Sequence, residues 1–100
     1  MIDCNSLDEV REHINHLDSR IVPLLAERAG YVRQAAGFKA TKNAVVDTDR
    51  IEQIIRRVRH LAVEQKCDPD LVEHIYRSMI DAFIVFEAKV WKSLHEEPRP

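Results

Sequence analysis

The sequence predicts an all-α fold of three helices, and three observations lead to that prediction. Apolar residues recur every three or four positions from Ser6 to Lys39, which is the spacing of one helix face. The 100 residues contain only two glycines and four prolines, while 32% are charged. Asp68-Pro69 sets an N-cap residue directly before a proline, an order typical of a helix start.

The first predicted helix runs from Ser6 to about Phe38, after an extended lead-in over residues 1–5. Ser6 and Glu9 form the pattern of a capping box, in which a hydroxyl and a carboxylate each accept a hydrogen bond from a free amide at the helix start. Pro23 lies inside this helix and lacks an amide hydrogen. Because the apolar pattern resumes in phase at Leu24, we expect a kink there and not a break.

The length of this helix suggests that it needs a partner. A helix of about 30 residues is roughly 45 Å long, whereas a compact chain of this size has a radius of gyration of about 13 Å. An apolar stripe that projects beyond the core of one chain must be covered. A second copy of the same chain is the simplest cover.

Two shorter helices are expected to follow a polar loop over residues 39–46. Asp47 or Thr48 caps the second, which spans about residues 49–64, and the third runs from Asp68-Pro69 to about Leu94. The third helix is apolar on several faces, as expected of a helix buried between others. We predict one domain over residues 1–100, frayed at about 1–5 and 95–100.

Composition limits the classes of function. The formal net charge of −2 argues against a dedicated nucleic-acid binder, and no apolar run is long enough to span a membrane. No signal peptide is visible, and Cys4 and Cys67 are expected to be free thiols in a reducing cytoplasm. His13 and His16 have the spacing of a metal pair but no obvious third ligand, so no metal is predicted.

Three cations on or beside the first helix are candidates for anion binding. Arg28 borders the apolar stripe, where it must either bind an anion or pair with a carboxylate of another helix. Arg11 also lies at the edge of the stripe, and its alternative is an exposed ion pair with Asp8 or a contact with Asn15. Lys39 falls on about the same side as Arg28, or is simply a solvated helix end.

The distance between the two arginines supports the expected dimer. Arg11 and Arg28 are 17 residues apart, which is roughly 26 Å along a straight helix. No metabolite-sized ligand spans that distance. If both arginines hold one small anion, they must come from different chains.

Other polar residues have competing interpretations. Glu87 follows an apolar run, so it should either meet a cation, such as Lys89 or an arginine of another helix, or lose its charge through desolvation. Asp47 and Arg50 flank the second helix, where Asp47 acts as a cap unless both serve a site. A basic cluster on the second helix is expected to be a solvated face: Arg56, Arg57, Arg59 and His60.

The order of these residues resembles a known family. Val10-Arg11-Glu12, Leu25-Ala26-Glu27-Arg28, Phe38-Lys39-Ala40, Asp49-Arg50 and Glu87 follow one another as in the all-α chorismate mutases and the related isochorismate pyruvate lyase. The resemblance covers Asp3 to about Leu94. It implies an intertwined homodimer of three-helix chains with two equivalent, shared active sites, and no metal or cofactor.

The resemblance also implies roles for individual residues. Arg28, together with Arg11 of the partner subunit, would clamp the two carboxylates of a dianionic substrate. Lys39 would donate to the ether oxygen. The remaining positions would shape the pocket, Asp47 and Arg50 near the ring hydroxyl and Val32 and Phe83 as apolar walls.

Position 87 departs from the commonest family pattern, which has a glutamine that donates to the ether oxygen. An ionised carboxylate cannot donate, so we hypothesise that Glu87 works in its protonated form. The first functional prediction is chorismate mutase, in aromatic amino-acid biosynthesis. The alternatives are isochorismate pyruvate lyase, which makes salicylate and pyruvate, and a non-catalytic helical dimer that binds a partner.

Overall fold

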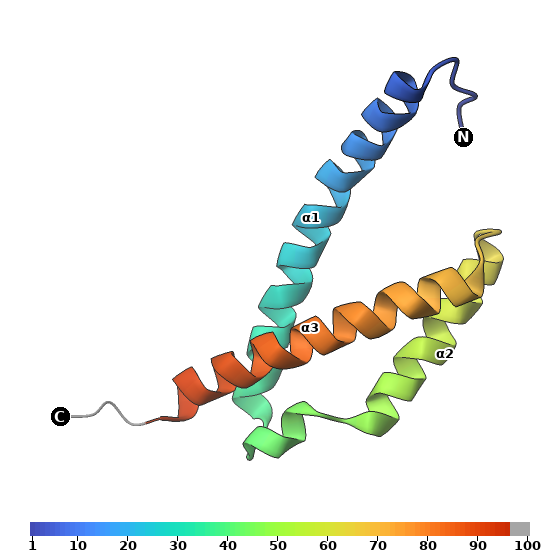
Figure 1. Ribbon diagram of the computed structural model, residues 1–100. Coiled ribbons are helices and arrows are strands. Elements are labelled where there is room, and N and C mark those ends of the chain that lie inside the picture. The colour runs from blue at the N-terminus through green and yellow to red at the C-terminus, as the bar shows by residue number, and fades with distance from the viewer. Residues whose placement is uncertain (97–100) are drawn as a thin grey trace. The chain divides into compact units, whose positions relative to one another are not determined.

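The computed structural model describes residues 1–96, and over that range it contains three α-helices, one short 3₁₀ helix and no strand (Figure 1). The elements are α1 (Leu7–Phe38), η1 (Lys42–Val45), α2 (Thr48–Glu64) and α3 (Pro69–His95). The predicted all-α fold of three helices is confirmed. Residues 97–100, most of the predicted frayed tail, lie outside the described residues.

The capping prediction for α1 is confirmed with a small shift. The Ser6 hydroxyl accepts a hydrogen bond from the Glu9 amide at 3.2 Å. In the usual capping box the Glu9 carboxylate would accept a hydrogen bond from the Ser6 amide. Here it accepts one from the Asn5 amide, one residue earlier, at 2.9 Å. Both contacts satisfy amides that have no partner inside the helix, so they define where α1 begins.

Pro23 does not interrupt α1, which is continuous from Leu7 to Phe38. The missing amide of Pro23 removes the hydrogen bond that the Ser19 carbonyl would otherwise accept. The Ser19 hydroxyl donates to the Asn15 carbonyl at 3.1 Å, one turn earlier. The predicted absence of a break at Pro23 is therefore confirmed, and the expected kink stays a prediction.

The chain divides into two compact units, Met1–Tyr31 and Val32–Pro100, which we call the N-terminal and C-terminal units. The N-terminal unit consists of the lead-in and most of α1. Its apolar residues at helical spacing, here called the α1 stripe, are 36–64% exposed: Leu7, Val10, Ile14, Leu17, Ile21, Leu24 and Leu25. One chain thus leaves the stripe open to solvent.

The C-terminal unit contains the hydrophobic core of the described residues. Helix α3 packs against α2 and against η1. The buried apolar side chains come from all four elements: Ala36, Val45, Ile55, Val58, Ala62, Ile80 and Val90. The end of α1 also meets α3 within this unit, where the Arg33 guanidinium lies over the Phe86 ring.

The loop predicted over residues 39–46 is more ordered than expected, because it contains η1. Val45 is only 5% exposed and lies in the core. Burial of the Val45 side chain stabilises this segment. The polar residues around Val45 gave no indication of that burial. Helix α3 ends at His95, one residue from the predicted end near Leu94.

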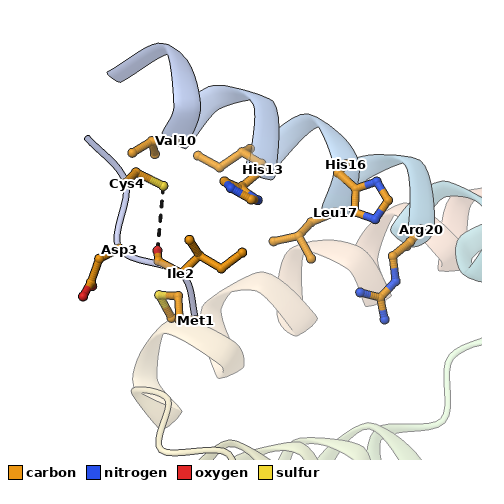
Figure 2. A pocket seen from close by; sticks show the side chains of 10 residues that line it. Met1, Ile2, Asp3, Cys4, Val10, His13, His16, Leu17 and Arg20 are labelled. Atoms are coloured by element: carbon orange, nitrogen blue, oxygen red, sulfur yellow. Dashed lines mark hydrogen bonds between the residues drawn. The ribbon is translucent and has the colours of Figure 1, made fainter. Parts of the chain in front are cut away.

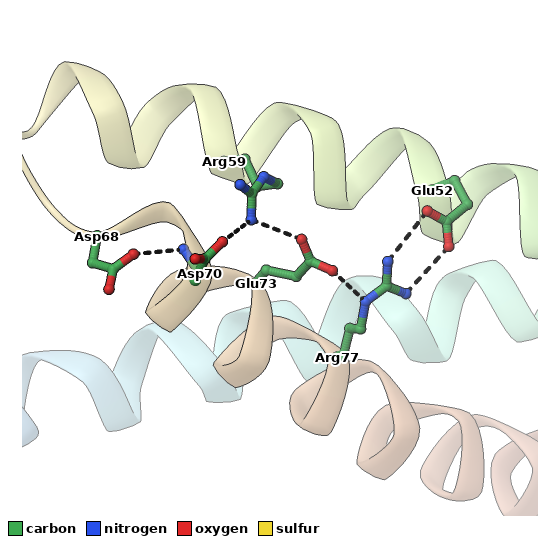
Figure 3. Close-up of polar contacts among 6 residues, drawn as sticks. All are labelled: Glu52, Arg59, Asp68, Asp70, Glu73 and Arg77. Atoms are coloured by element: carbon green, nitrogen blue, oxygen red, sulfur yellow. Dashed lines mark hydrogen bonds and ion pairs between the residues drawn. The ribbon is translucent and has the colours of Figure 1, made fainter.

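A network of ion pairs joins α2 to α3 (Figure 3). Arg59 of α2 contacts Asp70 and Glu73 of α3, both at 2.9 Å. Arg77 of α3 contacts Glu73 at 2.8 Å and reaches across to Glu52 of α2 at 3.2 Å. Glu73 lies between the two arginines and so couples the pairs.

The network shifts the ionisation of its members. The hydrogen bond from Arg77, with a second from Arg59, lowers the pKa of Glu73 below its ordinary value even though desolvation opposes this. The hydrogen bonds to Asp70 and Glu52 raise the pKa values of Arg59 and Arg77, respectively. Of the predicted solvated basic face, Arg56 and Arg57 are exposed, whereas Arg59 is committed to this network.

The depressed pKa of Glu73 predicts a pH dependence of stability. A carboxylate whose pKa is lower in the folded state stabilises the fold above its unfolded pKa, and that stabilisation is lost as the pH falls through the folded value. We expect Glu73→Gln to lower the thermal midpoint at pH 7 by a few degrees, on the order expected for exposed pairs. Thermal unfolding from pH 7 to 3 should show this difference shrinking below about pH 4.

Glu12→Gln is the matched control, because Glu12 is exposed on α1 and makes no ion pair within residues 1–96. Its thermal midpoint should follow that of the wild type over the same range. A Glu73→Gln deficit that is independent of pH would contradict the role given to the Glu73 charge.

Candidate active site

The candidate site centres on a shielded ion pair in the C-terminal unit. The Lys39 ammonium, just beyond the end of α1, lies 2.5 Å from Oε2 of Glu87 on α3. The Glu87 side chain is 10% exposed and that of Lys39 is 27% exposed. Water screens such a pair poorly, so the two charges interact more strongly than exposed pairs do.

Trp91 holds the backbone of the same lysine. Its indole Nε1 donates to the Lys39 carbonyl at 2.9 Å, and the Lys39 amide donates to the Ala36 carbonyl at 3.4 Å. Trp91 belongs to the apolar third helix, and its sequence pattern did not mark it as a functional residue. The available signal was its position four residues after Glu87, which places both on one face of α3.

The partner of Glu87 differs from the partners named from sequence. Of the two predicted alternatives, a cation or loss of charge, the structure shows a cation, but it is Lys39 and not Lys89 or an arginine. Of the two interpretations of Lys39, a solvated helix end does not describe the structure, because the Glu87 carboxylate holds its ammonium.

Asp47 is the N-cap of α2, and its carboxylate accepts from the Arg50 amide at 3.0 Å. The capping interpretation of Asp47 is therefore confirmed. The side chains of Asp47 and Arg50 are both exposed, so the cap leaves the Arg50 guanidinium accessible. A role for either in substrate binding stays a prediction.

The two predicted apolar wall residues are half-buried in the C-terminal unit. Phe83 lies one helical turn before Glu87 on α3 and packs edge-on against Phe86, with ring centroids 6.1 Å apart. The Arg33 guanidinium covers the Phe86 ring at 5.6 Å. Val32 is also half-buried, and its place in a pocket wall stays a prediction.

Arg11 and Arg28 belong to the N-terminal unit, where both lie on α1. Arg11 is exposed and Arg28 is half-buried. The exposed ion pair predicted as the alternative for Arg11 is not among the ion pairs found within residues 1–96. Because α1 is continuous between these arginines, the estimate of roughly 26 Å along the helix applies to the folded chain.

The N-terminal unit also contains a hollow of about 640 Å³ between the lead-in and α1 (Figure 2). Figure 2 shows Ile2, Cys4, His13 and Leu17 around it, with the Cys4 thiol donating to the Ile2 carbonyl at 3.7 Å. Cys4 and Cys67 are free cysteines. His13 and His16 line the same hollow.

No group of three or more histidine, cysteine or acidic side chains in residues 1–96 is arranged to hold a metal ion. None of the helices in that range combines the length and apolar character that crossing a membrane requires.

Comparison with known proteins points to one family. The family model for chorismate mutase type II matches residues 10–88. The isochorismate pyruvate lyase of Pseudomonas aeruginosa is 31% identical over 90% of this chain and 89% of its own length. The chorismate mutase of Methanocaldococcus jannaschii is 29% identical over 75% of this chain and 77% of its own length.

A third relative is much longer than this chain. The bifunctional chorismate mutase/prephenate dehydratase of Buchnera aphidicola is 28% identical over 88% of this chain but only 23% of its own length. The similarity therefore concerns one segment of that protein. All of the predicted site residues of this chain lie within residues 10–88, the range that the family model matches.

Proposed function

Because the chain belongs to the chorismate mutase type II family, we propose that it converts chorismate to prephenate at a site shared by two copies of the chain. The observation that carries this proposal is the shielded pair of Lys39 and Glu87. It places a cation and an acid where the described residues exclude most water. The reaction is pericyclic, so it requires positioning and charge stabilisation and no nucleophile.

Lys39 is the residue that stabilises the breaking ether bond. Negative charge develops on the ether oxygen as the bond lengthens, and an ammonium group stabilises it most where water is scarce. A lysine has three N–H donors, so Lys39 can keep one on Glu87 while another reaches the substrate. The 27% exposure of its side chain leaves it within reach of a ligand.

Arg28 and Arg11 of the partner subunit bind the two carboxylates of the substrate. A guanidinium grips a carboxylate through two parallel hydrogen bonds, which fixes both its position and its orientation. Val32 and Phe83 supply apolar walls, and Asp47 and Arg50 shape the side near the ring hydroxyl. Cys4 and Cys67, both free thiols, agree with a cytoplasmic location for such an enzyme.

The dimer is part of the proposal, because the α1 stripe is open in one chain. Seven apolar side chains of the stripe are 36–64% exposed, and a second α1 packed against them would remove that surface from water. The same packing brings Arg11 of one chain toward Arg28 of the other. A two-fold arrangement then makes two equivalent sites.

Isochorismate pyruvate lyase is the second candidate function, because a relative of that name matches this chain at 31% identity over 89% of its length. Isochorismate is also a dianion with an ether bond that breaks, so Arg28 and Lys39 would serve it in the same way. Position 87 slightly favours the mutase, since glutamate occurs there in some mutases and the lyase pattern has glutamine, whereas Phe38-Lys39-Ala40 resembles the lyase branch.

The first prediction concerns the substrate. We expect kcat/KM for the conversion of chorismate to prephenate to exceed kcat/KM for the conversion of isochorismate to salicylate and pyruvate. Arg28→Ala should lower kcat/KM on the order of a hundredfold or more, because a charge-assisted carboxylate contact is lost. Product analysis of both incubations checks this, with Arg56→Ala as the control because Arg56 is exposed on α2.

Each other outcome selects an alternative. A higher kcat/KM with isochorismate supports the lyase. Absence of turnover with both substrates supports a non-catalytic dimer, in which Arg28→Ala would change only folding or association.

The second prediction concerns the shared site. Arg11→Ala and Arg28→Ala homodimers should both be nearly inactive, but co-refolding equal amounts should restore about a quarter of wild-type activity, since half of the dimers are mixed and each has one intact site. The measurement is chorismate turnover before and after co-refolding.

Co-refolding Arg28→Ala with Arg28→Met is the matched control, because that mixture contains no intact site. Activity in the test mixture no greater than that of the two parents would contradict a site built from two chains.

The third prediction concerns the protonated form of Glu87. The hypothesis from the sequence is that Glu87 donates to the ether oxygen, which only the protonated form of a carboxyl group can do. Wild-type activity should therefore fall as the pH rises, whereas Glu87→Gln should be less sensitive because an amide donates at every pH. Pairs of kcat/KM profiles from pH 5 to 9 check this, and parallel alkaline falls in both would show that Glu87 is not the donor.

A further inference from the structure

Helix α3 holds Lys39 at two points. Its Glu87 carboxylate contacts the Lys39 ammonium at 2.5 Å, and the Trp91 indole donates to the Lys39 carbonyl at 2.9 Å. Glu87 and Trp91 are four residues apart, so they are neighbours on one face of α3. One helix face therefore holds both the side chain and the backbone of the lysine.

The Trp91 contact falls where the backbone most needs a partner. The last carbonyls of a helix have no amide within the helix to bond, and Lys39 follows directly after Phe38, the last residue of α1. A partly buried indole N–H also requires an acceptor. The single hydrogen bond satisfies both groups and fixes the backbone as the chain leaves α1.

The indole is itself held in place. The His95 ring stacks on it with centroids 4.2 Å apart and an interplanar angle of 14°. His95 Nδ1 lies 2.8 Å from the Trp91 carbonyl, which ties the histidine to the same turn of α3. Trp91 thus presents its N–H from a ring that has little freedom to turn away.

We infer that Trp91 is a positioning residue that sets where the Lys39 ammonium can reach, an inference that rests on the proposed function for its consequence in catalysis. A lysine side chain has four rotatable bonds, and its ammonium is placed accurately only when its backbone is fixed. Displacement of a reacting group by about 1 Å can reduce the rate a hundredfold. Trp91 acts on the reaction only through Lys39.

Trp91→Phe tests this inference, because phenylalanine keeps an aromatic ring against His95 and removes the N–H donor. We expect kcat for chorismate to fall about threefold to tenfold, the fold-change that corresponds to one net hydrogen bond, with a smaller change in KM. Tyr76→Phe is the matched control, since Tyr76 is half-buried on α3 and the same change there should leave kcat unaltered.

A double-mutant cycle with Lys39→Met separates positioning from a general structural role. If Trp91 acts through Lys39, Trp91→Phe should have almost no further effect on the residual kcat of Lys39→Met, because coupled residues are not additive. An equal fold-change in both backgrounds would overturn the inference.

Hydrogen exchange supplies a readout that does not depend on turnover. In substrate-free protein, Trp91→Phe should speed the exchange of amides in residues 38–42 and leave α2 unchanged. If the wild type turns over neither chorismate nor isochorismate, the proposed function fails. Faster exchange in Trp91→Phe that is confined to residues 38–42 would still support the placement of Lys39 by Trp91. Unchanged exchange at 38–42 overturns that placement whatever the activity.

Discussion

The contact between Lys39 and Glu87 is the interaction that allows the C-terminal unit to bury a charged residue. Glu87 is the one buried charged residue in the described part of the chain, at 7% exposure. A buried carboxylate without a cation is costly enough to oppose folding. The fold therefore has to bring a cation to this point of α3, and it does so by ending α1 one residue before Lys39. The position at which α1 ends therefore also determines where the Lys39 charge lies.

This ion pair differs in kind from the network between α2 and α3. Arg59, Glu73 and Arg77 are substantially open to water, with side chains 29–43% exposed, so salt and solvent weaken their attraction and they contribute little each. Glu87 is shielded from water, so its attraction to Lys39 is stronger than the attraction within the exposed pairs. The exposed network joins two helices, whereas the shielded pair provides a cation for the buried carboxylate of Glu87.

The sequence predicted the helices well because their apolar residues are regularly spaced and their starts carry clear caps. Ser6, Asp47 and Asp68 all cap as expected. It did not predict η1, because a four-residue 3₁₀ turn has no period to detect and depends on the burial of Val45. Short elements whose stability comes from tertiary contacts leave little trace in local sequence.

The candidate site was predicted residue by residue but not as a set of contacts. Lys39 and Glu87 were each singled out, one as a cation beside a helix and the other as an acid after an apolar run. Their pairing spans 48 positions in the chain, and no local pattern reports a contact of that range. Trp91 was missed because an indole in an apolar helix is indistinguishable from core until the acceptor of its N–H is known.

The proposed second copy of the chain is supported by charge and by geometry together. Arg11 and Arg28 lie on one continuous helix, too far apart to hold the same small anion from a single chain. The α1 stripe on the same helix is apolar and exposed, so the surface that would bring two copies together carries the arginines with it. In a two-fold dimer each chain gives Arg28 to one site and Arg11 to the other. In the proposed dimer, both sites would therefore be completed by the same association of two chains.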